Sequence, residues 1–289
     1  MIILVTGSNG QLGSELKKIS TTSTEHDWYF TDVDTLNICN KDDIELFFKD
    51  RNIDICINCA AYTAVDKAED DEEKEKAKII NSDAPLFLAD VCKKHNSILI
   101  HISTDYVFDG TSLNPYMEND TINPQSVYGK TKADGEINII NSGCSYIIIR
   151  TAWLYSSFGN NFVKTMLRLA SERDYVNVVD DQSGNPTWAY DLAFSILMII
   201  QRNGKNPIHD IFHFTNEGIT NWYNFAAAIF DISNKECKVK PISTKDFGSK
   251  AKRPAFSAMD KTKIKEFTGI KIPFWRDSLI KCIEEINNK

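Results

Sequence analysis

The chain has 289 residues, of which 42% are hydrophobic and 25% charged, a composition typical of soluble globular proteins that disfavours intrinsic disorder and a membrane protein. A formal net charge of −7 disfavours a general role in nucleic-acid binding, which relies on clustered Lys and Arg. The length suffices for one large α/β domain, or for a nucleotide-binding domain with a smaller lobe.

The first apolar segment, Ile2–Thr6, predicts a strand. It is too short for the core of a signal peptide and lacks a basic flank. The most apolar later stretch, residues 192–200, is interrupted by Ser195 and is far shorter than a membrane span. The seven Cys residues are odd in number and mostly lie in apolar stretches, which favours reduced thiols. We therefore expect a soluble, cytoplasmic protein that has no membrane partner.

Five short apolar runs alternate with helical patterns over the first half of the chain. Such continuous runs are typical of a parallel sheet that helices cover on both faces. Because crossovers between parallel strands are right-handed, we expect a doubly wound, Rossmann-type α/β arrangement. The predicted strands are Ile2–Thr6, Trp28–Thr31, Ile53–Cys59, Ile98–Ser103 and Tyr146–Thr151.

Three glycines, Gly7, Gly10 and Gly13, follow the first predicted strand, and a helical run begins directly after them. Glycines at this spacing suit a sharp turn, a close approach of backbone to a pyrophosphate, and tight packing of the helix on the strand. The helix N-terminus would direct free N–H groups at the phosphates. The triplet alone is a weak indication, but its place between a strand and a helix predicts a dinucleotide site.

An acidic residue at the end of the second predicted strand indicates a nicotinamide dinucleotide. Asp32 lies 19 residues after Gly13. A carboxylate there can accept hydrogen bonds from the adenosine ribose and repels a 2′-phosphate, which slightly favours NAD(H) over NADP(H). The alternative is that Asp32 is a turn residue and that neighbouring Asp34 competes for the role.

The next segment has two features with ordinary structural explanations. Cys56 and Cys59 could suggest a metal site, but residues three apart on a strand point to opposite faces. No second Cys/His pair has zinc-ligand spacing, so we predict no metal. The mixed charges of Asp66–Lys78 are typical of a solvated helix face with Glu–Lys pairs.

Tyr128 and Lys132 lie four residues apart and therefore on one face of a predicted helix. An ammonium beside a phenol lowers the tyrosine pKa, so that the phenol can exchange a proton. Ser103 and Thr104 end the fourth predicted strand, at the sheet edge where α/β proteins bind ligands. Thr104 could hold a substrate carbonyl there, or could be a strand-end turn residue. His101 is more consistent with a core or supporting residue than with a catalyst.

The regular alternation weakens after about Trp153, and five prolines interrupt shorter elements between residues 186 and 273. We therefore expect a dinucleotide-binding domain at residues 1–152 and a smaller C-terminal lobe at residues 153–289. The chain is expected to return to the sheet between residues 175 and 215, near Tyr175–Asp180 and Ile211–Thr215.

The glycine loop, the strand-end hydroxyl and the Tyr–Lys pair occur together in one order, and on these residues the chain resembles the extended short-chain dehydrogenases/reductases. Longer segments narrow the resemblance to the dTDP-4-dehydrorhamnose reductase family, over nearly the whole chain. These segments are residues 57–69 (INCAAYTAVDKAE), 103–110 (STDYVFDG), 126–136 (SVYGKTKADGE), 150–170 (RTAWLYSSFGNNFVKTMLRLA) and 180–188 (DDQSGNPTW).

The resemblance implies that NADH or NADPH reduces the 4-keto group of dTDP-6-deoxy-L-lyxo-4-hexulose and that the C-terminal lobe binds this nucleotide sugar. It implies that Tyr128 is the general acid, that Lys132 holds the nicotinamide ribose and lowers the tyrosine pKa, and that Thr104 completes the catalytic set. The implied cofactor contacts are Gly7, Gly10, Gln11, Leu12, Gly13, Asp32, Leu36, Asn37, Ala60, Ala61, Thr63, Tyr128 and Lys132. The implied substrate contacts are Thr104, Asp105, Trp153, Asn161 and Arg253, the last two at the diphosphate. For Arg253, a solvated surface arginine is an equal alternative.

Two departures from the family pattern concern assembly and cofactor. Some relatives are described as binding Mg²⁺ through glutamates at a dimer contact; Glu15 is present here, but Tyr190 stands where a glutamate would be needed. A metal-bridged dimer is therefore disfavoured, and a homodimer is left open. Asn37 stands where many relatives have Asp, which leaves the choice between NADH and NADPH open.

Two other functions are alternatives. A nucleotide-sugar 4,6-dehydratase or epimerase could use the same scaffold, but dehydratases of this superfamily follow the catalytic Thr with Asp and Glu. Here Tyr106 follows Thr104 and Asp105, so the general acid/base for removing water is missing. A non-catalytic regulatory subunit could also keep the fold, since fold does not fix function. Such a subunit has no need of the Tyr128–Lys132 pair.

Overall fold

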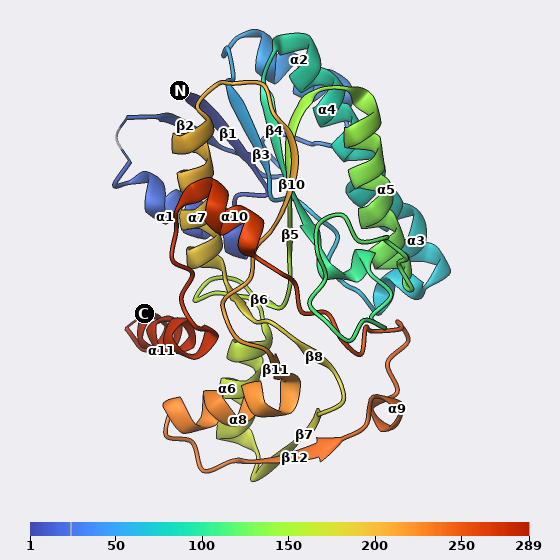
Figure 1. Cartoon of the computed structure of the whole chain (residues 1–289), viewed down its shortest axis with the longest axis vertical. Helices are drawn as coiled ribbons and strands as arrows, with labels where there is room; N and C mark the ends of the chain where they lie inside the picture. Colours follow the sequence, from blue (N-terminus) through green and yellow to red (C-terminus); the bar gives the residue numbers. More distant parts are fainter. Residues whose placement is uncertain (24, 289) are drawn as a thin grey trace.

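The structure, a computed structural model, describes residues 1–23 and 25–288. One part of the molecule is a sheet flanked by helices, and the other part is a smaller, mostly helical lobe (Figure 1). Six parallel strands form the central sheet in the order β10-β5-β4-β3-β1-β2. The chain moves from β1 to β2 on one side and returns to β3 on the other, so the winding reverses between β1 and β3. The strands are β1 (Ile2–Thr6), β2 (Asp27–Phe30), β3 (Ile55–Asn58), β4 (Ile98–Thr104), β5 (Ser145–Thr151) and β10 (His209–His213).

Helices cover both faces of the sheet, which is why its inner strands are apolar on both sides (Figure 1). One layer consists of α1 (Gln11–Ser20), α7 (Ala189–Asn203) and α10 (Thr262–Thr268). The other layer consists of α2 (Lys41–Lys49), α4 (Ala84–His95) and α5 (Val127–Ser142). Three further elements lie beside α5: α3 (Asp71–Lys78) and the short helices η1 (Lys67–Glu69) and η2 (Ile79–Asp83). The short helix η3 (Asp105–Val107) directly follows β4.

Successive strand residues alternate between the two cores. Ile3 of β1 packs in the core under α1 and α7, whereas Leu4 packs in the core under α2 and α4. The same alternation sends Cys56 to the second core and Cys59 to the first, as expected from their spacing. All seven cysteines are free thiols. No group of three or more His, Cys, Asp or Glu side chains placed to hold a metal occurs within residues 1–23 and 25–288.

The smaller lobe has its own apolar core, centred on the buried rings of Tyr155, Phe225 and Trp275. Two of its helices, α6 and α8, pack against a two-stranded parallel sheet of β7 and β12. The lobe elements are β6 (Leu154–Tyr155), α6 (Phe162–Glu172), β7 (Tyr175–Val179), β8 (Ser183–Gly184), β9 (Thr187–Trp188), β11 (Thr220–Asn221), α8 (Trp222–Ile232), β12 (Lys238–Ile242), α9 (Thr244–Phe247) and α11 (Trp275–Asn287).

The expected α/β class with a doubly wound parallel sheet is confirmed, and each of the five predicted strands lies within two residues of an observed one. Of the two segments expected to return to the sheet, Ile211–Thr215 overlaps β10, which pairs with β5. The expectation for Tyr175–Asp180 is wrong, because β7 pairs with β12 in the lobe. Tyr175 and Asn177 are exposed, so this strand is buried on one face only. Within the described part of the chain, no helix has the length and apolarity needed to cross a membrane.

Candidate active site

A cleft runs along the carboxyl ends of β1, β3, β4 and β5, where the sheet domain meets the lobe. It consists of two adjoining cavities of about 300 and 550 Å³, which share Gly7, Gly10, Cys59 and Ala61. Every residue that the sequence assigned to cofactor or substrate lines one of these cavities, except Arg253. The fold therefore brings together side chains that lie as far apart in the chain as residues 7 and 161.

The glycine turn after β1 has the shape needed for close approach of another group. Gly7 has a φ of +63°, and a Cβ there would lie 2.6 Å from the Ala60 amide nitrogen. A Cβ on Gly13 would lie 2.5 Å from the Cα of Ser8. Gly10 is the N-cap residue of α1, and no side chain of the described residues caps this end of the helix. The first N–H groups of the helix therefore have no partners within it, and their residues line the cavity. This cradle fits the pyrophosphate of a dinucleotide.

The smaller cavity lies beyond the glycine turn and is lined by Asp32, Leu36 and Asn37. Asp32 accepts hydrogen bonds from the backbone N–H of Asn9 (2.9 Å) and of Val33 (2.8 Å). The two interpretations of Asp32 are therefore compatible. Its carboxylate ties the glycine loop to the end of β2, and it also faces the cavity where an adenosine ribose would lie.

The predicted catalytic residues meet in the larger cavity. The Tyr128 side chain hydrogen-bonds to Thr104, and Thr104 Oγ1 donates to Asp105 Oδ1 at 3.0 Å. The Tyr106 ring packs edge-on against the Tyr128 ring, with centroids 5.5 Å apart. The Tyr128 ring is partly open to the cavity, yet the surrounding protein raises the pKa of its hydroxyl to about 12, and only the hydrogen bond to Thr104 opposes this shift. The expectation that Lys132 lowers the Tyr128 pKa is therefore wrong: burial raises this pKa, and the neighbours that act on it are Thr104 and Asp105.

Lys132 is buried beneath this row. Its Nζ donates to the Ile102 carbonyl at 2.7 Å and lies 3.1 Å from His101 Nε2. Burial lowers the Lys132 pKa to about 8, although the nearby Glu136 and Cys59 side chains act to raise it. His101 is fully buried and does not line the cleft, which agrees with the supporting role expected for it.

Two glycines set the position of helix α5. Ser126 caps the helix by accepting a hydrogen bond from the Gly129 N–H (3.1 Å). A Cβ on Gly129 would lie 2.3 Å from the Tyr106 carbonyl oxygen, and one on Gly135 would lie 2.2 Å from the Asn81 carbonyl oxygen. Sequence reasoning did not identify either residue, although glycine inside a helix is a signal for close packing.

Trp153 and Asn161 line the lobe side of the larger cavity. Trp153 has a φ of +48°, and its ring stacks on that of Trp222 with centroids 3.7 Å apart. Asn161 caps α6 by accepting from the Lys164 N–H, while its amide donates to Gln11 Oε1 at 3.0 Å. Trp222 also lines the cavity, but no spacing in the sequence pointed to it.

Arg253 lies beside the cleft rather than in its lining. Its guanidinium forms a two-pronged ion pair with Asp66, at 3.1 and 2.5 Å. Asp66 belongs to the charged run that we expected to be a solvated helix face, so that expectation is wrong for this residue. Glu73 pairs with Lys76, as expected for this face, and also accepts a hydrogen bond from the Tyr62 hydroxyl (2.7 Å). The exposed ion pairs of Lys74 and its neighbours on α3 fit the expectation.

A buried ion pair below the catalytic residues was not predicted. Arg150 of β5 binds the Glu136 carboxylate at 3.0 and 2.7 Å, and Ser103 donates to the same carboxylate. Glu136 lies one helical turn after Lys132, so its helical spacing was the available signal.

The residues that bear on a metal-bridged dimer have other partners. Glu15 is buried and accepts a hydrogen bond from the Ser156 hydroxyl at 2.6 Å. The Tyr190 ring stacks on Trp188 and has the Lys18 ammonium 5.1 Å from its centroid.

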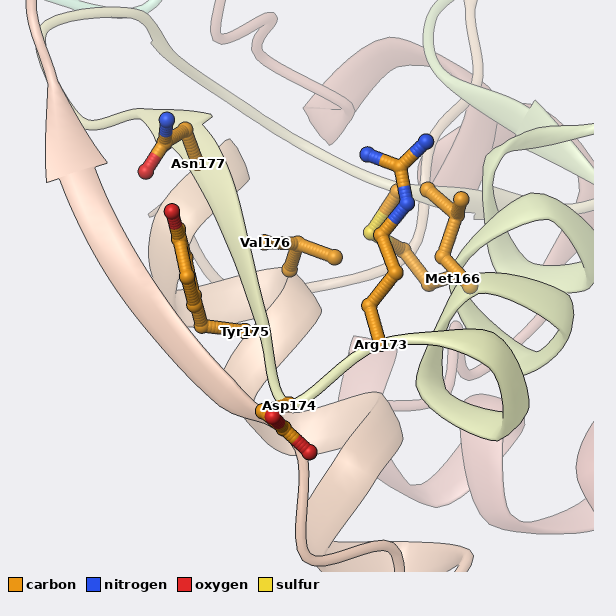
Figure 2. Close-up of a pocket in the computed structure, with 7 residues that line it drawn as sticks. Met166, Arg173, Asp174, Tyr175, Val176 and Asn177 are labelled. Atoms are coloured by element: carbon orange, nitrogen blue, oxygen red, sulfur yellow. The ribbon is translucent and has the colours of Figure 1, made fainter.

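A separate hollow lies in the lobe between the end of α6 and β7 (Figure 2). Val176 points toward Arg173 and Met166, while Tyr175 and Asn177 project from the other side of the strand (Figure 2). None of the predicted site residues lines this hollow.

Comparison with known proteins gives a consistent result. A protein-family model described as the RmlD substrate binding domain matches residues 1–288. The chain is 41% identical over 285 residues to a dTDP-4-dehydrorhamnose reductase from Aggregatibacter actinomycetemcomitans, with 96% of each chain covered. It is similar to the crystal structure of a dTDP-4-dehydrorhamnose reductase from Clostridium acetobutylicum (TM-score 0.93, 42% identity, 99% and 100% coverage). It is also similar to one from Bacillus anthracis in complex with NADP (TM-score 0.93, 36% identity, 98% and 99% coverage).

Proposed function

The chain belongs to the RmlD substrate binding domain family, whose members include the dTDP-4-dehydrorhamnose reductases that its motifs resemble, and on this basis we propose that it is an NAD(P)H-dependent dTDP-4-dehydrorhamnose reductase. It reduces the 4-keto group of dTDP-4-dehydro-6-deoxy-L-mannose and releases dTDP-L-rhamnose. The observation that carries the proposal is the hydrogen-bonded row of Tyr128, Thr104 and Asp105 beside a glycine cradle that fits a dinucleotide.

The residues of the row have distinct roles in this reaction. When bound, the nicotinamide supplies a hydride to the carbonyl carbon. When the substrate binds, the Thr104 hydroxyl turns its single proton from Asp105 to the carbonyl oxygen, and Tyr128 gives its phenolic proton to that oxygen as negative charge develops on it. A Tyr128 pKa of about 12 keeps the phenol protonated at neutral pH, which is the state that a proton donor requires. Lys132, when protonated, stabilises the phenolate that remains.

The cleft supports a nucleotide sugar as the substrate. Trp153 lies against the sugar, and the Asp105 carboxylate accepts a hydrogen bond from one of its hydroxyls. Asn161 and Arg253 lie toward the diphosphate. The substrate lobe consists mainly of residues 153–289, and the dinucleotide-binding domain is residues 1–152 together with β10, α7 and α10, which return to the sheet.

For the cofactor, we propose that both NADH and NADPH react and that NADH is slightly favoured. Asp32 supports this preference, because its carboxylate lies in the smaller cavity, where it would repel a 2′-phosphate. The B. anthracis relative holds NADP, so NADPH is the control in any assay of preference. A larger kcat/KM with NADPH than with NADH would contradict the proposal.

For location, we propose the cytoplasm, which the seven free thiols support as a reducing compartment. A homodimer stays a prediction, and its test is the mass of the chain in solution.

The test of the function is consumption of NADH or NADPH, followed by absorbance, with enzymatically prepared dTDP-4-dehydro-6-deoxy-L-mannose. We expect turnover by the native chain and a loss of roughly a hundredfold or more in kcat for Tyr128→Phe, because general acid catalysis contributes about that much. Cofactor affinity should change little, since the ring is retained.

The alternatives give different results in the same assay. A non-catalytic subunit shows no cofactor oxidation before or after the substitution. A dehydratase releases elimination products from dTDP-glucose, a result disfavoured by Tyr106, whose ring packs on Tyr128 where such an enzyme has a carboxylate. Either outcome would overturn the proposal.

A further inference from the structure

A row of buried polar side chains runs behind the catalytic residues, from β1 through β3 and β4 to α5. Thr6 Oγ1 donates to Asn58 Oδ1 at 2.8 Å, and Asn58 Nδ2 lies 3.1 Å from His101 Nδ1. The other ring nitrogen of His101, Nε2, lies 3.1 Å from Lys132 Nζ. All four residues are at most 1% exposed. Polar groups so deeply buried require matched donors and acceptors, so the contacts constrain where the protons lie.

A backbone amide fixes the orientation of Asn58. The Ala60 N–H, which can only donate, points at Asn58 Oδ1 at 3.2 Å. The side-chain NH₂ of Asn58 therefore faces His101 Nδ1, and this ring nitrogen has to accept. Burial holds the His101 pKa well below its usual range, so the ring is neutral and has one proton. That proton lies on Nε2.

This tautomer places a donor against Lys132. An ammonium has donors only, whereas a neutral amine also offers a lone pair. The amine can accept from His101 Nε2–H while it donates to the Ile102 carbonyl. The ammonium would leave two donors facing each other.

The other titratable groups that act on Lys132 do so in the opposite direction, because Glu136 and Cys59 raise its pKa. Glu136 and Tyr128 are on α5 with Lys132, and Cys59 follows β3. Glu136 favours the ammonium, but its carboxylate is shared with Arg150 and Ser103. Burial makes the Cys59 thiolate hard to form. His101 is therefore the neighbour whose hydrogen-bond geometry selects the amine.

We propose that His101 is a positioning residue which, held in the Nε2–H tautomer by Asn58, stabilises Lys132 as the neutral amine. The catalytic consequence rests on the proposed function: Lys132 loses its ammonium, and with it the support for Tyr128, at a pH below the ordinary range of lysine. The tautomer itself is a property of the protein alone and is measured without substrate.

The first measurement is a long-range ¹H–¹⁵N correlation spectrum of the full chain labelled on its five histidines. The His101 signals are assigned by their loss in His101→Phe, and we expect the Nε2–H pattern. His213 is the internal control, because its Nδ1 faces the Tyr116 carbonyl at 3.1 Å and has to carry the proton. An Nδ1–H or doubly protonated His101 overturns the proposal.

The second measurement reverses the tautomer. Asn58→Asp keeps an acceptor oxygen for Thr6 and Ala60, but a second carboxylate oxygen replaces the NH₂ group that faces His101. The His101 ring proton should therefore move to Nδ1, where it can be donated to this oxygen. His101 Nε2 then accepts from the ammonium, and we expect the basic limb of the kcat/KM pH profile to move up by about one pH unit or more. The added negative charge acts in the same direction, so a moved limb supports the proposal only together with a reversed tautomer.

Thr6→Val is the matched control, because it removes one hydrogen bond to Asn58 Oδ1 and leaves the Ala60 contact. The tautomer and the midpoint of the basic limb should stay where they are in the native chain. A reversed tautomer in Asn58→Asp with an unmoved basic limb overturns the proposal, as does an unmoved tautomer. An Nε2–H signal in a chain that turns over no substrate supports the tautomer and contradicts only the proposed function.

Discussion

The Asp105 carboxyl group lies in the wall of the cleft and is 2% exposed. Its Oδ1 accepts from Thr104, while none of the residues in the described ranges donates to Oδ2. Burial raises the Asp105 pKa to about 6, against the influence of the Ser257 and Thr104 hydroxyls, which lower it. A buried acceptor without a partner is costly, and it is suited to a hydroxyl that arrives with the substrate.

This shift has a measurable effect on stability. An Asp in an unfolded chain has a pKa of about 3.9. Between that value and about 6, the folded chain holds a proton that the unfolded chain has lost, so stability falls as pH rises and stays lower above the window. Asp105→Asn removes the ionisation. We expect it to raise the free energy of unfolding by on the order of 2 kcal/mol at pH 7.5 and to change it little near pH 4, as measured by urea titration.

Asp109 is the control for this prediction, because hydrogen bonds led by that from Thr111 lower its pKa to about 2. Asp109→Asn should therefore lower stability at pH 7.5 instead of raising it. The more stable Asp105→Asn chain should also show a higher KM for the nucleotide sugar, since an amide is a weaker acceptor than a carboxylate. Equal stability of Asp105→Asn and the native chain at both pH values would contradict the expectation that the ionised Asp105 carboxylate destabilises the folded chain.

At the scale of the element, helix α5 is the part that positions the proton chemistry. Tyr128, Lys132 and Glu136 occupy successive turns of one helical face. Glu136 binds Arg150 of β5 and Ser103 of β4, so the helix is anchored to the strands whose ends form the cleft. A small slide of α5 would separate Tyr128 from Thr104.

Gly129 tests this dependence on helix position. Gly129→Ala introduces a methyl group 2.3 Å from the Tyr106 carbonyl oxygen, so either helix α5 or the Tyr106 backbone has to shift. We expect the free energy of unfolding to fall by about 1–3 kcal/mol, which is typical of overpacking. We expect kcat to fall roughly a hundredfold, as for a displacement of about 1 Å in a catalytic group.

The neighbouring Lys130→Ala is the matched control, because Lys130 is exposed on the same helix. Its stability and kcat should stay close to those of the native chain. Gly129→Ala with native kcat would show that the close approach of α5 to Tyr106 does not position Tyr128.

The sequence predicts the central strands well for a physical reason. Strands such as Ile98–Thr104 are buried on both faces and are apolar throughout, which distinguishes them from helices and surface segments. Tyr175–Val179 alternates exposed and buried residues, a pattern of a one-sided strand that we assigned to the wrong sheet. The glycines of α5 and the Glu136–Arg150 pair each carried a local signal, but the group that each contacts could not be predicted, because it depends on how elements pack, which a local pattern does not specify.

At the scale of the whole molecule, the cleft depends on contacts between the sheet domain and the lobe. Gln11 of α1 accepts from Asn161, and Asp66 binds Arg253, 187 residues further along the chain. Trp222 reaches the cleft by stacking on Trp153. Sequence reasoning selected Trp153 and Asn161 as candidates from a family motif and Arg253 from the family resemblance, but their partners could not be predicted, since contacts over such separations leave no periodic signal.

Arg253 can have one of two roles, and its ion pair with Asp66 provides a way to distinguish them. If it binds the diphosphate, Asp66 holds the guanidinium ready, and the positive charge is what matters. If it only joins the two parts of the molecule, the ion pair is what matters. Hydrogen bonds to charged groups contribute about 1.5–3 kcal/mol, so loss of a diphosphate contact should raise KM for the nucleotide sugar roughly tenfold or more.

We therefore expect Arg253→Gln to raise KM by that amount with little change in kcat, and Asp66→Asn to change KM less than about threefold. Asp66 is 41% exposed at its side chain, so loss of the ion pair should cost less than about 1 kcal/mol of stability in either variant. Steady-state kinetics and urea unfolding of the two variants measure both quantities. Because both substitutions break the same ion pair but only Arg253→Gln removes the cation, equal increases in KM would mean that Arg253 acts as a tether and does not contact the substrate.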